Sequence, residues 1–167
     1  METASFPVGQ ELQKVKYELF DWEEQPSSVA LVDDIATAVC LQWGDLSEVR
    51  ITWRNPSYWE EEGLDFGGTQ KKGTESVDVS ARWKPLIGAT LDRVTPLYSN
   101  AFTHRTWAIR LEFGNGTNLI IALGALKEGI PSYMPDNLIV TASEIIARAY
   151  WPSNSDEYCT ETSAWGA

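Results

Sequence analysis

The sequence is poor in the residues that usually build metal and redox sites: it has one histidine and two cysteines among 167 residues. A lone His104 excludes multi-histidine metal sites and any mechanism that needs two histidines. Cys40 and Cys159 lie far apart and form no metal or redox motif, so we expect two reduced thiols. These counts predict a protein with no metal and no cofactor.

Two further features that the sequence lacks bear on its location. No apolar run approaches the roughly 18 residues of a membrane span. The first thirteen residues, METASFPVGQELQ, have neither the basic nor the apolar region of a signal peptide. We therefore expect a cytoplasmic protein that does not bind membranes.

Basic residues are also scarce. Lysine and arginine together number 13, against 24 aspartate and glutamate residues, which gives a formal net charge of -11. Nucleic-acid binding requires clustered Lys and Arg, so this composition argues against nucleic acid as a ligand. A hydrophobic fraction of 43% and eight tryptophans exclude intrinsic disorder and predict a folded domain.

Common catalytic and metal-binding motifs are absent: the sequence has no G-x-S-x-G elbow, H-E-x-x-H pair or EF-hand loop. Residues 67–74 have the composition of a phosphate loop, but the lysine precedes the final glycine, so we expect a flexible loop. Cys40 lies between apolar residues and is predicted to be a buried structural thiol. Consecutive glutamates in a polar loop share one solvated environment, which makes them poor acid–base pairs. The sequence therefore predicts no catalytic residues and a protein that is not an enzyme.

The two halves of the chain contain similar segments in the same order. Residues 7–15 resemble 86–94, and residues 39–53 align without a gap on 109–123. Shorter matches join Pro56-Ser57-Tyr58 with Pro131-Ser132-Tyr133, and residues 81–85 with 147–152. This order predicts an internal duplication with units at about 7–83 and 84–152. Chance similarity between two ordinary hairpins is the alternative.

Each unit has the pattern of paired β-strands. In the second half, Trp107, Ile109, Leu111 and Phe113 alternate with smaller or polar residues, as in a strand with one buried face. Gly114-Asn115-Gly116 predicts a tight turn before a returning strand over 119–123. The first half has equivalent strands over 37–43 and 49–53. Further strands are predicted over 15–19, 91–98 and 138–140, and Pro96 favours an edge position for the second of these.

The remaining segments complete the fold prediction. Ser143 could cap a short helix over 144–150, although a continued strand is the competing interpretation. Residues 54–80 are polar and Gly-rich, and we expect them to form an excursion outside the paired strands. Residues 153–167 are expected to be a flexible tail. We predict a mainly β protein, either all-β or α+β with one short C-terminal helix. Its single domain, over 1–152, would be a pseudo-two-fold sandwich or barrel of about eight strands.

The acidic residues are concentrated in the first half. Residues 7–83 contain 15 acids and 7 bases, whereas residues 84–152 contain 5 acids and 6 bases. Many of these acids adjoin aromatic residues. Such a combination suits a protein-binding face, because aromatic rings anchor a partner and carboxylates attract its Lys and Arg. The alternative is that Trp22 and Trp59 belong to the core. The candidate partner-binding residues are Trp22, Glu23, Glu24, Trp59, Glu60, Glu61, Glu62 and Asp65.

The segments LEFGNGTNLIIALG and PSYMPDNLIV carry a resemblance to known proteins. Their outline, L-x-F-x-[ND]-G…L-x-I-x-[LIV]-G…Y-x-P-D-x-L-x-V, resembles that of small uncharacterised bacterial proteins. The size, acidity and β content are similar to those of immunity proteins of bacterial toxin systems. This resemblance implies binding and neutralisation of a toxin, with no shared catalytic residues to transfer.

Four functional hypotheses follow. The leading one is a cytoplasmic immunity protein that inhibits a basic toxin by covering it with the acidic and aromatic residues. A second is a β-sandwich or barrel that binds a small molecule in a Trp- and Tyr-lined pocket. A third is a homodimer that extends its sheet through an unpaired strand at 117–123. The fourth is an enzyme using Asp or Glu with His104 or Arg105.

Overall fold

The computed structural model describes residues 6–23, 27–29, 32–54, 63–98, 106–143 and 146. In this part of the chain, thirteen β-strands form three antiparallel sheets and there is one 3₁₀ helix. The predicted mainly β class is confirmed. A five-stranded sheet has the order β6-β5-β4-β1-β7. Its strands are β1 (Leu12–Phe20), β4 (Ala38–Trp43), β5 (Glu48–Trp53), β6 (Leu64–Phe66) and β7 (Thr74–Asp78).

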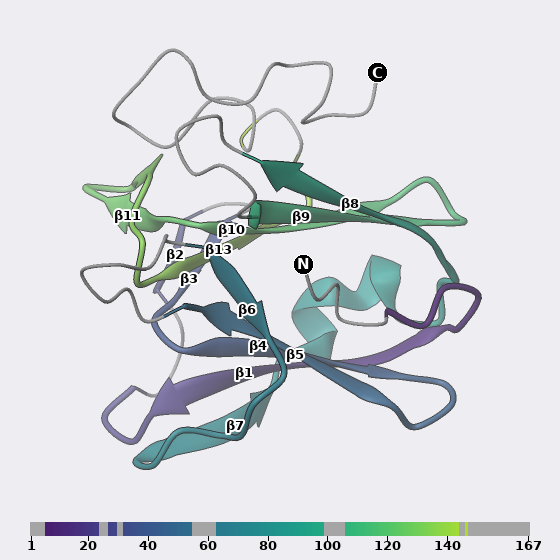
Figure 1. The fold of residues 1–167 in the computed structure, drawn as a ribbon, viewed down its shortest axis with the longest axis horizontal. Helices are drawn as coiled ribbons and strands as arrows, with labels where there is room; N and C mark the ends of the chain where they lie inside the picture. The colour runs from purple at the N-terminus through teal and green to yellow at the C-terminus, as the bar shows by residue number, and fades with distance from the viewer. Residues whose placement is uncertain are drawn as a thin grey trace.

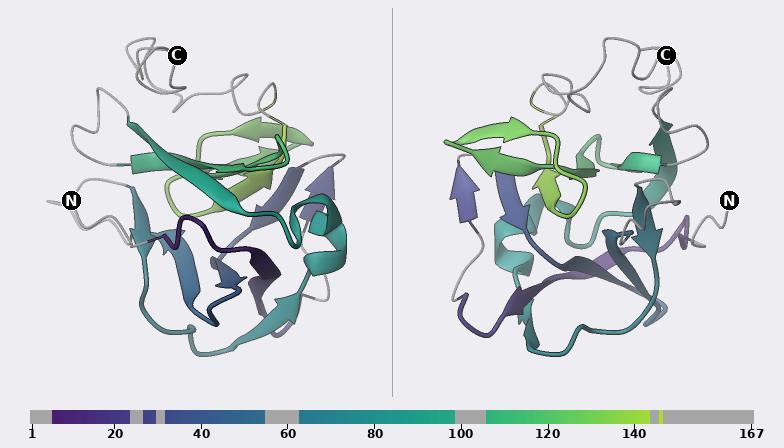
Figure 2. Two further views of the ribbon diagram at one scale, coloured as in Figure 1. Left: turned by 90° about the vertical axis from the view of Figure 1, so that its right-hand side faces the viewer. Right: turned by 60° about the vertical axis from the view of Figure 1, so that its left-hand side comes forward.

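A second, six-stranded sheet has the order β2-β3-β13-β10-β9-β8. Figures 1 and 2 show the two larger sheets as two layers, with the 3₁₀ helix η1 (Ser80–Leu86) at one side. The strands of the second sheet are β2 (Ser27–Val29), β3 (Val32–Ile35), β8 (Leu91–Tyr98), β9 (Thr106–Phe113), β10 (Asn118–Leu123) and β13 (Leu138–Thr141). A separate hairpin pairs β11 (Ala125–Lys127) with β12 (Ile130–Ser132).

The hairpins predicted from alternating hydrophobicity are confirmed. Strands β4 and β5 pair across the first turn, and β9 and β10 pair across the second. The strands predicted from Val15, Leu91 and Leu138 are also present, as β1, β8 and β13. Strand β8 is an edge strand, as Pro96 predicted, because proline has no N–H to donate to a neighbouring strand.

Three expectations about these strands were wrong. The segment 117–123 is not an unpaired edge, because β10 lies between β13 and β9. Strand β9 is buried on both faces, since Ala108 and Arg110 are buried as well as the alternating apolar residues. The segment 54–80 is more than a polar excursion, because it contains both edge strands of the five-stranded sheet, β6 and β7. Strand β6 has only three residues and β7 is mostly polar, so neither shows a clear period.

The C-terminal helix prediction falls mostly outside the described residues. Within them, the Ile146 N–H donates to Ser143 Oγ at 3.3 Å, which is the contact expected of a capping serine. Residues 144, 145 and 147–152 and the predicted tail 153–167 lie outside the described residues.

One hydrophobic cluster takes side chains from both larger sheets. Trp43 on β4 and Phe113 on β9 stack within it, with ring centroids 6.4 Å apart and planes 20° from parallel. Trp43 and Trp107 are among the largest fully buried side chains. Aromatic side chains of this size bury about 150–250 Å² each, so these rings contribute much of the apolar surface removed from water.

The segments that begin β1 and β8 exchange equivalent hydrogen bonds. The Gly9 N–H donates to the Leu91 carbonyl at 2.8 Å, and the Gly88 N–H donates to the Leu12 carbonyl at 2.7 Å. Each glycine precedes its leucine by three residues, so the two bonds are reciprocal. Both glycines have φ near +90°, a conformation that other residues rarely adopt.

The β4–β5 turn and the β9–β10 turn contain the same internal hydrogen bonds. Asp45 Oδ1 accepts hydrogen bonds from the backbone N–H and the hydroxyl of Ser47. Asn115 Oδ1 accepts the same two bonds from Thr117, which confirms the predicted turn there. Such side-chain-to-backbone bonds are characteristic of Asx turns.

A buried polar network connects the two larger sheets and η1. The Asp33 carboxylate on β3 is fully buried and accepts a hydrogen bond from the Tyr17 hydroxyl on β1 at 2.7 Å. It also accepts from Ser28 Oγ at 2.6 Å and forms an ion pair with Arg82 at 2.5 Å. The Trp83 indole N–H in turn donates to the Tyr17 hydroxyl at 2.7 Å. Burial, together with Asp33, raises the pKa of Tyr17 well above its usual value of 10.

We predict that Tyr17→Phe lowers the free energy of unfolding by about 1–3 kcal/mol. The substitution removes one donor to a buried carboxylate and leaves the Trp83 N–H without its acceptor. Urea denaturation at neutral pH would measure this loss. A change below about 0.5 kcal/mol, the size typical of surface substitutions, would contradict a structural role for the network.

Candidate functional site

The described residues include three of the eight predicted partner-binding side chains. Trp22, Glu23 and Asp65 are described, whereas Glu24, Trp59 and residues 60–62 lie outside the described residues. The core alternative for Trp22 is wrong, because this side chain is 75% exposed. The site is therefore built from the three described residues and the strand ends from which the other segments leave.

Trp22 is held flat on the protein surface. Its ring stacks on Phe20 with centroids 4.4 Å apart and an interplanar angle of 4°. Phe20 is the last residue of β1, and the chain turns immediately after it. The stack supports one face of the exposed indole, so the other face is presented to solvent in a defined orientation.

Glu23 closes the turn that carries Trp22. Its backbone N–H donates to the Phe20 carbonyl at 2.8 Å, and its Oε1 accepts the Phe20 N–H at 3.1 Å. The side chain is half-buried. Glu23 therefore helps to fix the position of Trp22 through its bonds to the Phe20 backbone, a role that the sequence did not indicate.

Asp65 lies on the edge strand β6, exposed to solvent. Its Oδ1 accepts the N–H of the next residue, Phe66, at 3.1 Å. In the sheet register Asp65 pairs with Thr52, which pairs with Ala38, which pairs with Glu18. Asp65 is therefore in the same row as Glu18, two residues before the end of β1.

These positions lie toward one end of the five-stranded sheet, which we call the Trp22 end. Strands β1 and β5 both pair antiparallel with β4, so they run in the same direction and finish at this end, at Phe20 and Trp53. The chain then returns to the sheet at β6, which begins at Leu64. The described residues 21–23 and 63–65 thus adjoin the same end of the sheet.

A buried ion pair on the outer face of this sheet was not predicted. Glu18 is 1% exposed and pairs with Arg50 at 2.7 Å. The pair holds the loop 67–73, because Arg50 Nη1 donates to the Gly67 carbonyl and the Lys71 N–H donates to Glu18 Oε1, both at 3.1 Å. The loop joins β6 to β7 at the opposite edge, so it has to cross the sheet.

The same loop places a cation on an aromatic ring near the Trp22 end. Lys71 Nζ lies 4.1 Å from the ring centroid of Trp53, a cation–π distance. The sequence does not predict this contact, because Lys71 and Trp53 come from segments that only the fold brings together.

Two further acids of the first half serve the fold. The acidic pair Asp33-Asp34 is engaged in internal hydrogen bonds: Asp34 accepts from the Leu126 N–H and from Asn137 Nδ2, each at 2.7 Å. In the part of the chain that is described, no group of three His, Cys, Asp or Glu side chains could hold a metal ion.

Cys40 is buried on β4, as predicted for a structural thiol. Burial, with smaller contributions from Glu48 and Glu18, raises the pKa of the Cys40 thiol to about 11. His104 and Cys159, the other residues considered for nucleophilic chemistry, lie outside the described residues.

Comparison with known proteins gives no relative: no family model, curated protein or solved structure matches this chain. Across the described ranges, no helix is long and apolar enough to cross a membrane.

We predict that Cys40 reacts slowly with a thiol reagent in the folded protein. Because the thiolate is the reactive form and the pKa is raised, little thiolate is present at pH 8. A Cys159→Ser variant isolates Cys40, and its labelling rate with and without denaturant would measure the protection. We expect labelling at least about a hundredfold slower in the folded state. Equal rates would contradict the buried position.

Proposed function

We propose that this chain is a non-enzymatic binding protein that recognises a basic protein partner through the Trp22 end. Most concretely, it is a cytoplasmic immunity protein that inhibits a basic bacterial toxin by covering it. The observation that carries this proposal is the exposed Trp22 ring, held flat on Phe20. A large aromatic side chain kept in one orientation in solvent is a suitable anchor for a protein interface.

The arrangement of the strand ends supports a single binding surface. Because β1 and β5 finish at the same end, segments 21–24 and 58–65 can contribute to one contact area. Their carboxylates would raise the encounter rate with a basic partner, and the aromatic rings would provide buried contact once it has docked.

The charges near this end also support the proposal. Arg50 is engaged with Glu18, and Lys71 lies on Trp53. These two cations therefore make contacts within their own chain. The contact area would keep the acidic character that a basic partner needs.

We further propose that the fold arose by duplication and forms a pseudo-two-fold sandwich. The reciprocal bonds of Gly9 and Gly88 support this, and an isolated bridge pairs Glu11 with Thr90. Each of these residues immediately precedes the leucine of its unit, so a two-fold axis would pass between them. Both larger sheets have open edges, which favours a sandwich over a closed barrel.

We predict that Trp22→Ala weakens partner binding at least about tenfold, the loss typical of an aromatic anchor. The partner would be captured from the lysate and secreted fraction of the source organism at low salt and identified by mass spectrometry. Its affinity for each variant would then be measured by calorimetry.

A matched control is Ile130→Ala, which removes another exposed hydrophobic side chain, 68% exposed on β12. This variant should bind as wild type, and both variants should unfold within about 0.5 kcal/mol of it. Equal binding by all three proteins would show that the Trp22 end is not the contact surface.

A second prediction concerns the charges. Replacing Glu60, Glu61 and Glu62 with lysine should slow association with the same partner at low salt by about tenfold or more, with a smaller effect on dissociation. The difference should disappear at high salt. The double variant Glu128→Lys, Asp136→Lys alters exposed acids elsewhere and serves as the control. Salt-independent association that is insensitive to the triple change would contradict electrostatic attraction.

A further inference from the structure

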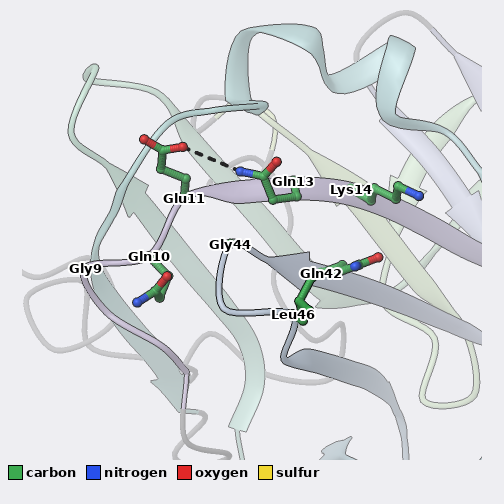
Figure 3. A pocket seen from close by; sticks show the side chains of 8 residues that line it. All are labelled: Gly9, Gln10, Glu11, Gln13, Lys14, Gln42, Gly44 and Leu46. Carbon is green, nitrogen blue, oxygen red and sulfur yellow. Dashed lines mark hydrogen bonds between the residues drawn. The ribbon is translucent and has the colours of Figure 1, made fainter.

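A polar hollow of about 590 Å³ lies at the opposite end of the five-stranded sheet, beside the β4–β5 turn (Figure 3). This volume lies within the range of small-ligand sites. Unlike most such sites, the hollow is lined mainly by polar side chains. The lining residues are Gly9, Gln10, Glu11, Gln13, Lys14, Gln42, Gly44 and Leu46.

Three glutamine amides give the hollow its chemistry. Each side-chain amide both donates and accepts hydrogen bonds. Gln10 and Gln13 both lie near Gly44, where an added Cβ would be 3.4 Å from Gln10 Oε1 and 3.9 Å from Gln13 Nε2. The two charged lining residues, Glu11 and Lys14, are of opposite sign, so the lining has no net charge.

An apolar side chain stands at the rim in a strained conformation. Leu46 has φ +69° and is 79% exposed. The left-handed conformation is unfavourable for a leucine but not for glycine. The equivalent position in the second hairpin is Gly116, with φ +82°. The turn itself does not require a leucine, and its exposed side chain adds no packing to the core. Strain kept at an exposed position suggests a functional contact.

The second hairpin also shows that the fold does not require the glutamines. The pair Leu91–Phe113 corresponds to Leu12–Trp43 in the first half. Counted from these two pairs, the positions of Gln10, Gln13 and Gln42 are occupied by Ala89, Asp92 and Glu112. Glu112 forms an ion pair with Arg93 at 2.6 Å. The three amides and the strained leucine are therefore features of the first hairpin alone.

We propose that this hollow binds a neutral, polyhydroxylated ligand of one or two sugar rings. Sugar hydroxyls donate and accept in the same way as the amides, and the C–H face of a sugar ring suits Leu46. A fully apolar ligand would leave the amides without partners. A charged ligand would gain little from a lining with no net charge.

The test uses the full chain labelled with ¹⁵N and follows the glutamine side-chain NH₂ signals by two-dimensional NMR. Glucose, N-acetylglucosamine, maltose and lactose are added separately up to tens of millimolar. We expect the signals of Gln10, Gln13 and Gln42 to shift with at least one sugar. The signal of Gln70, whose amide donates to the Thr74 carbonyl, should stay in place. Absence of any shift for the three lining residues with all four sugars would overturn the proposal.

Two further probes distinguish other ligand classes. Glucose 6-phosphate should perturb the three signals no more than glucose does. Shifts with the phosphate ester alone, or with N-acetyl-trialanine amide but no sugar, would assign the hollow to an anion or a polypeptide and overturn the proposal.

Two variants test the residues themselves. Gln10→Ala with Gln42→Ala should weaken sugar binding at least tenfold. Leu46→Gly should raise the thermal unfolding midpoint while weakening binding, because it relieves strain and removes the ring contact. A Leu46→Gly variant that binds as wild type would contradict the role of the leucine. Trp22→Ala should leave sugar binding unchanged, so this proposal and the protein-partner proposal can fail separately.

Discussion

The fully buried carboxylate of Asp33 constrains how the two larger sheets and η1 fit together. Removing a carboxylate from water costs several kcal/mol, and the cost is offset only when charged and polar donors surround it. Tyr17 comes from one sheet, Ser28 from the other, and Arg82 from η1. Apolar contacts are non-directional, whereas these bonds hold in only one relative placement of the three elements. The network therefore selects the orientation of a core that apolar burial stabilises.

Local patterns explain which parts of the fold could be predicted. The two central hairpins were predicted because their alternation and turn residues are encoded within short segments. Strands β6 and β7 were not predicted because they are short, have no clear alternation, and depend on their neighbours in the sheet. The role of Asp33 could not be predicted, since Tyr17 and Arg82, the residues that satisfy it, are remote in sequence. Long-range pairing of this kind leaves no local signal.

The two candidate surfaces differ in how far sequence could lead to them. The combination of an aromatic residue with acids drew attention to Trp22, and its position just beyond a strand explains its exposure. The hollow was not predicted, because its glutamines come from two separate segments that only the sheet register brings together. Leu46 aligned with Gly116 in sequence, but the difference gained meaning only once both backbone conformations were known. The surfaces lie at opposite ends of one sheet and can act independently.

The loop 67–73 connects strands at the two edges of the five-stranded sheet and is held halfway by Glu18 and Arg50. It crosses the sheet and is attached to it by these hydrogen bonds. If one edge strand detached, the loop would strain its hydrogen bonds to Glu18 and Arg50, and with them the strand at the other edge. The two edges are thus linked through the loop, and detaching an edge strand would strain the hydrogen bonds that Gly67 and Lys71 make with the buried Glu18–Arg50 pair. The loop therefore ties two short edge strands to a buried pair that bridges β1 and β5.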